Sequence, residues 1–431
     1  MNGAWLLALL TIAAFIGSVL FVPQIPIGKR LKLKCYPFIP LLGAGFMLAF
    51  GYVHVEGIVS SFTADSSVNP IRILILFLSM TVFSLILEQT GFFEHISGVI
   101  LQKSGHSQHK IFLALYAVIS TLTIFTSNDI VILTFTPFIC HFCRAAKIDA
   151  IPYLIMEFAA ANTWSLLLLI GNPTNIYISG AFEIGFAAYL QTMLFPTIAA
   201  GLTSLVIMSL IFRKKLSGEI TVKNEISPIS DYPLMWVSLL HLGGCVVLLA
   251  ISQYIGLEMW LISLCMAASV ILCSIVCRLV RGKGIECVGR AIGKLPYEII
   301  PFIVGMFIIV LALEENAFIE KTAALFSHDK TVFSFGLLSF LSCNVLNNIP
   351  MSVLFSKILD VNASGGQIYA TIVGSNLGAF ITPVGALAGI MWSNLLKQNK
   401  VKLSTLRFIV TGILIGVPSV LAALGVLEWL T

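Results

Sequence analysis

The stretch TSNDIVILTFTP, residues 126–137, places an amide and a carboxylate in the middle of an apolar run. This run extends from Ile111 to Phe142 and is long enough to enter a bilayer, with Asn128 and Asp129 near its centre. A carboxylate at that depth costs about 2.5–3.5 kcal/mol on insertion scales, and such residues mark ion or proton pathways. Asp129 is therefore a candidate for binding a coupling ion.

Three further polar breaks interrupt apolar segments in a similar way. Asn172 precedes Pro173 in GNPTN (171–175), Asn347 and Asn348 come just before Pro350 in LNNIP, and Thr382 precedes Pro383 in TPVG (382–385). An N-capping side chain with proline in the first turn predicts a helix start, and another helix is expected to start near Ile130 after Asn128 and Asp129. Four helix N-termini near the middle of a membrane would favour an anion or a polar oxygen ligand, and helix C-ends before the breaks would offer carbonyls to a cation.

The breaks and their neighbours supply the residues that we predict to bind substrate or ion. They are Ser127, Asn128, Asp129, Asn162, Gly171, Asn172, Thr174, Asn175, Asn347, Asn348, Asn376, Thr382 and Gly385. A lone Asn can also simply bridge two membrane helices, but four polar breaks in symmetric positions favour a site. Glu157 is the other deep acid, and the sequence leaves its role open. No catalytic or metal-binding residues are predicted.

Composition determines the kind of molecule that must position these residues. Hydrophobic residues make up 58% of the 431 and charged residues only 10%, against roughly a quarter in soluble proteins. An integral membrane protein of the all-α class is therefore expected, with about ten transmembrane helices. The predicted spans are 4–22, 36–53, 70–90, 149–178, 187–212, 233–253, 258–277, 297–314, 366–392 and 405–428.

The basic residues predict that two interrupted segments, 110–143 and 331–356, are re-entrant hairpins. Cytoplasmic loops of membrane proteins are enriched in Lys and Arg. With two hairpins, every Lys and Arg falls on the cytoplasmic side except Arg72, Lys321, Lys330 and Lys357. If the segments crossed the membrane, the basic clusters after each would lie on the wrong side. The chain is thus expected in the inner or plasma membrane as a multi-pass protein, with both termini outside.

An internal repeat relates the two halves of the chain. MTVFSLILEQTGFFE (80–94) aligns without a gap on MFIIVLALEENAFIE (306–320), and each copy precedes a hairpin and a span broken by Gly and Pro. The first half, 1–212, holds hairpin 110–143 and broken helix 149–178; the second, 233–431, holds hairpin 331–356 and broken helix 366–392. A cytoplasmic linker, 213–232, joins them. Because the hairpins enter from opposite sides, the pattern is an inverted-topology repeat, typical of secondary transporters.

The combination of motifs resembles the ion transporter superfamily over nearly the whole chain. FTSNDIVILTFTP, GNPTN, LNNIP and GSNLGAFITPVGALAGIMW carry the resemblance, which is greatest to the arsenite permease branch. The resemblance implies a scaffold with two hairpin-containing halves, often as a homodimer, with hairpin tips and broken-helix loops lining the site. The chain departs from that branch at IGNPTN (170–175) and at Asn376, where an acidic residue often occurs.

The expected function is arsenite or antimonite efflux by proton-coupled antiport. No Lys or Arg lies deep in the hairpins or broken spans, which favours a neutral oxyacid over a doubly charged anion. The alternatives within the superfamily are a Na⁺-coupled dicarboxylate or anion symporter and a Na⁺/H⁺ antiporter. The coupling ion is H⁺ or Na⁺, and no cofactor is expected.

Other classes fit the residues less well. An intramembrane aspartyl protease needs two cooperating carboxylates, and Asp129 has no Asp partner; HExxH and GxSxG motifs are absent. The chain also lacks a Walker A motif, although a separate ATPase subunit stays open. The expected partners are a small inorganic or organic anion or oxyacid and the lipid bilayer, with no nucleic acid.

Overall fold

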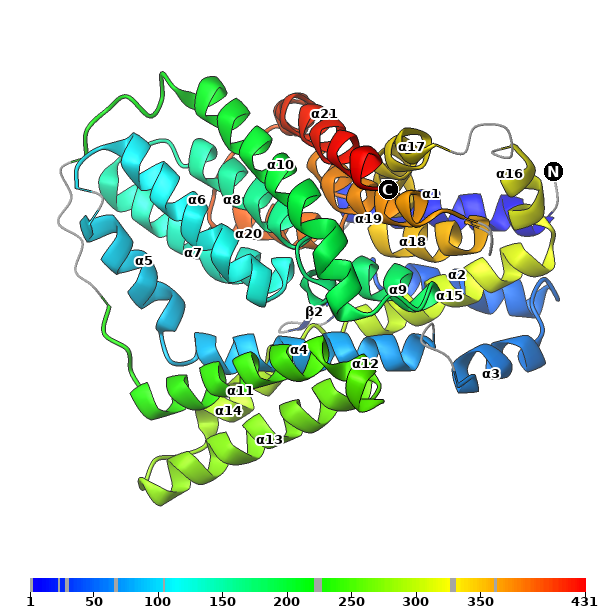
Figure 1. Ribbon diagram of the computed structural model, residues 1–431, viewed down its shortest axis with the longest axis horizontal. Coiled ribbons are helices and arrows are strands. Elements are labelled where there is room, and N and C mark those ends of the chain that lie inside the picture. The colour runs from blue at the N-terminus through cyan, green and yellow to red at the C-terminus, as the bar shows by residue number, and fades with distance from the viewer. Residues whose placement is uncertain are drawn as a thin grey trace.

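The structure is a computed structural model that describes residues 3–21, 24–27, 31–65, 69–103, 105–220, 227–325, 331–359 and 363–431. It is almost entirely helical (Figure 1). The first half contains α1 (Gly3–Phe21), α2 (Phe38–Ala49), α3 (Val55–Thr63), α4 (Pro70–Glu88), α5 (Phe92–Lys103), α6 (Gln108–Phe125), α7 (Asn128–Ala146), α8 (Ile151–Trp164), η1 (Leu169–Gly171), α9 (Pro173–Ala181) and α10 (Phe186–Phe212).

The second half repeats this order of hairpin, broken helix and long final helix. It contains α11 (Tyr232–Ala250), α12 (Ser252–Ile255), α13 (Met259–Val280), α14 (Glu286–Gly293), α15 (Ile299–Glu315), α16 (Phe318–Leu325), α17 (Val332–Leu346), α18 (Asn348–Ile358), α19 (Gly365–Leu377), η2 (Gly378–Phe380), α20 (Leu387–Gln398) and α21 (Thr405–Leu430). The sequence did not predict the antiparallel pair β1 (Gln24–Ile27) and β2 (Leu31–Lys34). Part of the predicted linker, 221–226, lies outside the described residues, as does Lys330.

Seven helices among the described residues are long and apolar enough to cross a membrane: α4, α6, α7, α10, α11, α13 and α21. Shorter apolar helices cover 3–19, α2 and α17. The predicted spans 149–178 and 366–392 are both helices broken in the middle, at η1 and at η2. The all-α membrane fold is therefore confirmed, and each arm of the first hairpin is itself long enough to span.

The segment predicted as the first hairpin turns back on itself. Phe112, in the first turns of α6, and Phe142, near the end of α7, both contact the ring of Tyr153, with centroids 6.1 and 6.3 Å away. In one continuous helix, thirty residues would separate two such rings by about 45 Å. The chain instead reverses at Thr126 and Ser127, which lie between α6 and α7.

The two hairpins open toward opposite ends of α15. The first opens beside the linker, where the Gln108 N–H donates to the carbonyl of Gly218. The linker lies beside the end of α4, because the N–H of Ser230 donates to the carbonyl of Thr90. The start of α15 lies there too, because Lys294, five residues before α15, pairs with Glu88 of α4. The second hairpin ends at Lys357, which pairs with Glu314 at the other end of α15. The prediction of inverted hairpins is therefore confirmed.

The halves interlock rather than pack as separate domains. Helix α4 of the first half packs on α11 and α13 of the second, while α15 of the second half packs on α1 and α2 of the first. The hairpin arms do the same, because α7 packs on α20 and α18 packs on α9. In Figure 1, α10 and α21, the last helices of each half, lie side by side. This exchange brings the broken elements of both halves together in the interior.

Candidate binding site between the hairpin tips

Four helices begin at one small cavity inside the protein. It is lined by Asn128 and Asp129 of α7, Asn172 and Pro173 at α9, Asn348 and Ile349 of α18, and Ala386, Leu387 and Ala388 at α20. It has room for about one water molecule and is closed in this conformation. Free N–H groups and helix dipoles point toward such a position. The sequence predicts that two hairpin tips and two broken helices share one site. The starts of α7, α9, α18 and α20 do lie together at this cavity.

The start of two of these helices differs from the prediction. Ser127, not Asn128 or Asp129, caps α7, and its hydroxyl accepts from the N–H of Ile130. Asn128 and Asp129 therefore lie in the first turn, where an acidic residue suits the helix dipole. Thr382 caps no helix, because α20 begins five residues later at Leu387. Asn172 and Asn347 do cap α9 and α18, as predicted.

Thr382 lies outside the cavity because a side chain from the second hairpin binds it. Its N–H and its hydroxyl both donate to Oδ1 of Asn344, at 2.9 and 2.8 Å. The amide nitrogen of Asn344 in turn donates to the carbonyl of Gly378. This clamp between α17 and the η2 break was missed in the sequence, where Asn344 looks like one polar residue in an apolar arm.

A network of buried amide side chains joins the two broken helices next to the cavity. Oδ1 of Asn376 accepts from Nδ2 of Asn172 at 2.8 Å, and Nδ2 of Asn376 donates to Oδ1 of Asn175 at 2.8 Å. Asn376 is fully buried, so it ties α19 of one half to α9 of the other. Three more residues complete the network: Thr174, Ser165 and Ser375.

Three acceptor groups at the cavity have no partner among the described residues. Nδ2 of Asn128 donates to Oδ1 of Asn162 at 3.2 Å, which leaves Oδ1 of Asn128 buried and unpaired. Oδ1 of Asn348 is also buried without a partner. The carboxylate of Asp129, which is 4% exposed, accepts no hydrogen bond from a described residue. Buried polar groups are normally satisfied, so this cluster indicates a place for a bound donor.

Three other predicted residues, Gly385, Asn347 and Gly171, make their contacts with or through backbone atoms. The carbonyl of Gly385 accepts from the N–H of Asn348, and Nδ2 of Asn347 donates to the carbonyl of Val384. Gly171 has no space for a side chain, since a Cβ there would lie 2.3 Å from the carbonyl oxygen of Ser165. Pro173, Ile349, Ala386, Leu387 and Ala388 line the cavity but were not predicted, because apolar residues carry no signal of their own in an apolar segment.

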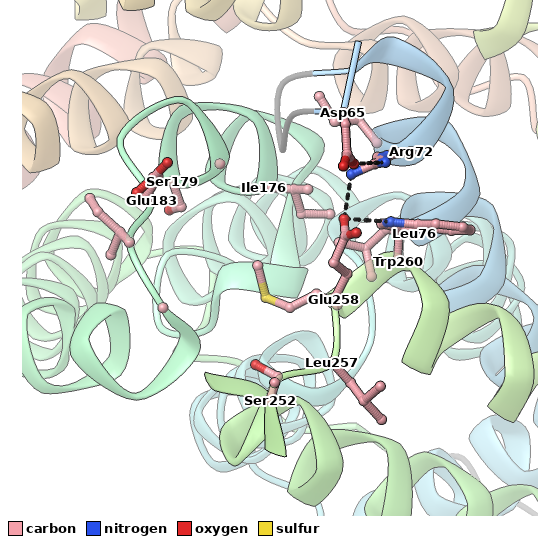
Figure 2. Close-up of a pocket in the computed structure, with 16 residues that line it drawn as sticks. Asp65, Arg72, Leu76, Ile176, Ser179, Glu183, Ser252, Leu257, Glu258 and Trp260 are labelled. Carbon is pink, nitrogen blue, oxygen red and sulfur yellow. Dashed lines mark hydrogen bonds and ion pairs between the residues drawn. The ribbon is translucent and has the colours of Figure 1, made fainter. Parts of the chain in front are cut away.

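A larger cavity lies at the end of the molecule where the second hairpin opens. It measures about 520 Å³ and is lined by α4, α9 and residues 252–260. Figure 2 shows Arg72 between Asp65 and Glu258, with Trp260 beside it. Glu183 and Ser179 lie across the cavity from this cluster. Helix α9 connects this cavity to the hairpin tips, because its first residue lines the central cavity and its last turns line this one.

A second cleft, of about 540 Å³, opens at the opposite end between α7 and α20. Its lining includes Cys140, Cys143 and Arg144 of α7 and Asn399 just after α20. Arg144 donates to the carbonyl of Asn399 at 2.9 Å, which joins the ends of the two helices. A closed central cavity between two open ones is the arrangement expected of alternating access.

Inverted hairpins whose tips enclose a small polar cavity define a membrane transporter. A family model described as citrate transporter, CitMHS, matches residues 5–371, and the chain belongs to this family of the ion transporter superfamily. The match covers both hairpins and the broken helix of the first half, and it ends inside α19, the first part of the broken helix of the second half.

Individual relatives extend this comparison. An arsenical pump membrane protein of Escherichia coli is 24% identical over 402 residues, covering 90% of this chain and 91% of the relative. Its counterpart in Yersinia enterocolitica is 26% identical and covers 81% and 84%. The crystal structure of the YdaH transporter of Alcanivorax borkumensis has a TM-score of 0.59 and 13% identity over 99% of this chain and 97% of that one, which shows a shared fold.

Proposed function

We propose that the protein exports arsenite or antimonite in exchange for protons. The observation that carries the proposal is the cavity where two buried amide oxygens without a partner among the described residues, Oδ1 of Asn128 and Oδ1 of Asn348, lie beside the Asp129 carboxylate. Arsenous acid is neutral at neutral pH and offers three hydroxyl donors. Three acceptors suit such a ligand, and the hairpin tips must move apart to admit it, because the cavity has room for about one water molecule. The similarity to arsenical pump membrane proteins supports the same substrate.

The charges of the site favour a neutral substrate. None of the nine lining residues is Lys or Arg, so a doubly charged anion would lose its hydration without a cation to pair with. Asp129 would bind the proton that exchanges for the oxyacid. Because substrate and proton would occupy the same cavity, loading one displaces the other, and this competition couples their opposite movements.

A sodium-coupled carboxylate symporter is the second candidate. The four helix N-termini at the cavity favour negative charge, and this observation is the specific one in its favour. The family description names citrate. Sodium would then bind at the Asp129 carboxylate and nearby carbonyls.

Expression in a bacterial strain that lacks its own arsenite exporters separates the two candidates. We expect resistance to arsenite and antimonite from the wild-type protein and loss of resistance with Asn348→Ala. Asn394→Ala, a half-buried residue of α20 outside the cavity, is the matched control and should keep resistance. Sodium-dependent uptake of citrate or succinate without arsenite resistance, at equal membrane expression, would favour the sodium-coupled carboxylate symporter.

A further inference from the structure

Glu157 is a second deep carboxylate, which the exchange proposed at the central cavity does not use. It is fully buried in α8. One carboxylate oxygen accepts from the hydroxyl of Thr136 on α7 at 2.8 Å. The other oxygen is buried without a partner among the described residues. The indole of Trp392 lies within reach of the Glu157 carboxylate, but it does not meet hydrogen-bond geometry with the second oxygen.

The surroundings of Glu157 join three elements from both halves. Trp392 of α20 packs on Phe158, the next residue after Glu157, with ring centroids 4.9 Å apart. The indole N–H of Trp392 is also buried and unpaired within the described part of the chain. The groups facing Glu157 are therefore Thr136 and Cys140 of α7 and the indole of Trp392. No described cationic side chain forms an ion pair with Glu157.

Cys140 links Glu157 to the cleft between α7 and α20. Cys140 is one helical turn beyond Thr136 on the same face of α7, and it lines this cleft. Cys140 is also within electrostatic range of Glu157. Along the axis of α7, Cys140 is thus about 5.4 Å, one turn, from Thr136. Arg144, one turn further along α7, also lines the cleft and is exposed.

On its other side Glu157 leads toward the hairpin tip. Asn162 follows five residues later on α8, about 7.5 Å along the helix, and its Oδ1 accepts from Asn128. Asp129 is the next residue. Glu157 is therefore located between the cleft and the carboxylate of the central cavity.

We propose that Glu157 is a proton-binding site through which Asp129 exchanges its proton with water in the cleft between α7 and α20. This inference rests on the proposed proton-coupled exchange. In efflux, protonated Asp129 gives its proton through intervening water to the Glu157 carboxylate. Glu157 then releases the proton to cleft water and is again a carboxylate, and Asp129 is free for the next cycle.

The transfer needs a carboxylate that can be both charged and neutral in place. The Thr136 hydroxyl and the Trp392 N–H can both donate to the charged form. In the protonated form one oxygen carries an O–H that can donate, and the group keeps acceptor capacity for the Thr136 hydroxyl and the indole N–H. The absence of a fixed cation keeps the neutral form accessible.

The test uses purified full-length protein in proteoliposomes, with a pH-sensitive dye and radiolabelled arsenite. For Glu157→Gln we expect arsenite–arsenite exchange at the wild-type rate and proton-coupled transport slowed by about tenfold or more. Glu157→Asp should recover part of the coupled rate. Equal losses of exchange and coupled transport in both variants would indicate a structural residue and overturn the proposal, as would wild-type coupled transport in Glu157→Gln.

An infrared measurement separates this inference from the substrate assignment. A pH step applied to the wild-type protein without substrate should give a carboxyl difference band that Glu157→Gln lacks. If wild-type protein fails to exchange arsenite but shows the band, the substrate is wrong and the proton site stands. If Glu157→Gln keeps the wild-type band, the proton site is wrong.

Discussion

Asn128 and Asn348 lie at the same cavity in the first turns of α7 and α18, and each has a buried amide oxygen without a partner among the described residues. They occupy matching positions in the two hairpins, which open to opposite ends of the molecule. Each hairpin therefore contributes one acceptor to a shared site, and movement of either tip would expose the site on one face.

Removing one of these acceptors should weaken substrate binding without unfolding the protein. For Asn348→Ala we expect about a tenfold loss of arsenite affinity, the equivalent of one hydrogen bond of roughly 1.4 kcal/mol. Asn344→Ala is the contrast, because that amide clamps Thr382 and Gly378 and should lower the melting temperature instead. Binding isotherms and thermal melts in detergent measure both. Unchanged affinity for Asn348→Ala would remove it from the site.

The close approach of α17 and α19 should tolerate no side chain at Gly374. A Cβ there would lie 1.9 Å from Oγ of Ser339 and 2.2 Å from the carbonyl oxygen of Gly336. Overpacking of this kind costs about 1–3 kcal/mol or more, so Gly374→Ala should reduce folded protein in the membrane. Gly425→Ala, in α21 with nothing within 4 Å of its Cβ, is the control. Equal yields and melting temperatures for the two variants would contradict this packing.

The orientation of the hairpins can be measured by thiol labelling in a background without native cysteines. Cysteines at His109 and Ala145, exposed at the two ends of the first hairpin, should be labelled from the cytoplasm. Cysteines at Thr331 and Lys357, exposed at the ends of the second, should be labelled from outside. Labelling of either pair from two different faces would make that segment a span.

Asp231 should stabilise the start of α11 only while it is charged. Burial raises the pKa of Asp231, but hydrogen bonds from Arg281 and Leu234 outweigh it and hold the pKa below its usual value. Because the folded pKa is lowered, the stability it contributes is present above the unfolded pKa of about 3.9 and is lost as pH falls through the folded pKa.

We therefore expect Asp231→Asn to melt at a lower temperature than wild type at neutral pH, with the difference shrinking below about pH 4. Asp65→Asn should change little, because Asp65 is largely exposed and such pairs contribute at most about 1 kcal/mol. A pH-independent difference for Asp231→Asn would show that its charge is not involved.

The sequence predicted the fold well because its signals are the ones that a bilayer enforces. Long apolar runs must be helices, and Lys and Arg positions distinguish a hairpin from a span. The repeat of LILEQTGFFE-like segments then implied two inverted halves. The short strand pair was missed because four-residue polar–apolar strands leave no comparable signal.

The sequence predicted the polar residues that line the central cavity and missed the apolar ones, and their role in binding stays a prediction. Asn128, Asp129, Asn172 and Asn348 stand out because amides and acids are rare in membrane helices. Thr382 was misplaced because TP predicts a helix start locally, whereas Asn344 binds it from another element. Such long-range contacts cannot be read from one segment.

Transport by Asp129→Asn tests the central claim most directly. This variant keeps the size of the side chain and removes its charge at the cavity. Because the amide oxygen of Asn can still accept a hydrogen bond from the oxyacid but cannot take up the coupling proton, we expect arsenite–arsenite exchange to persist in proteoliposomes and gradient-driven accumulation to disappear. Accumulation at the wild-type level by Asp129→Asn would contradict the account.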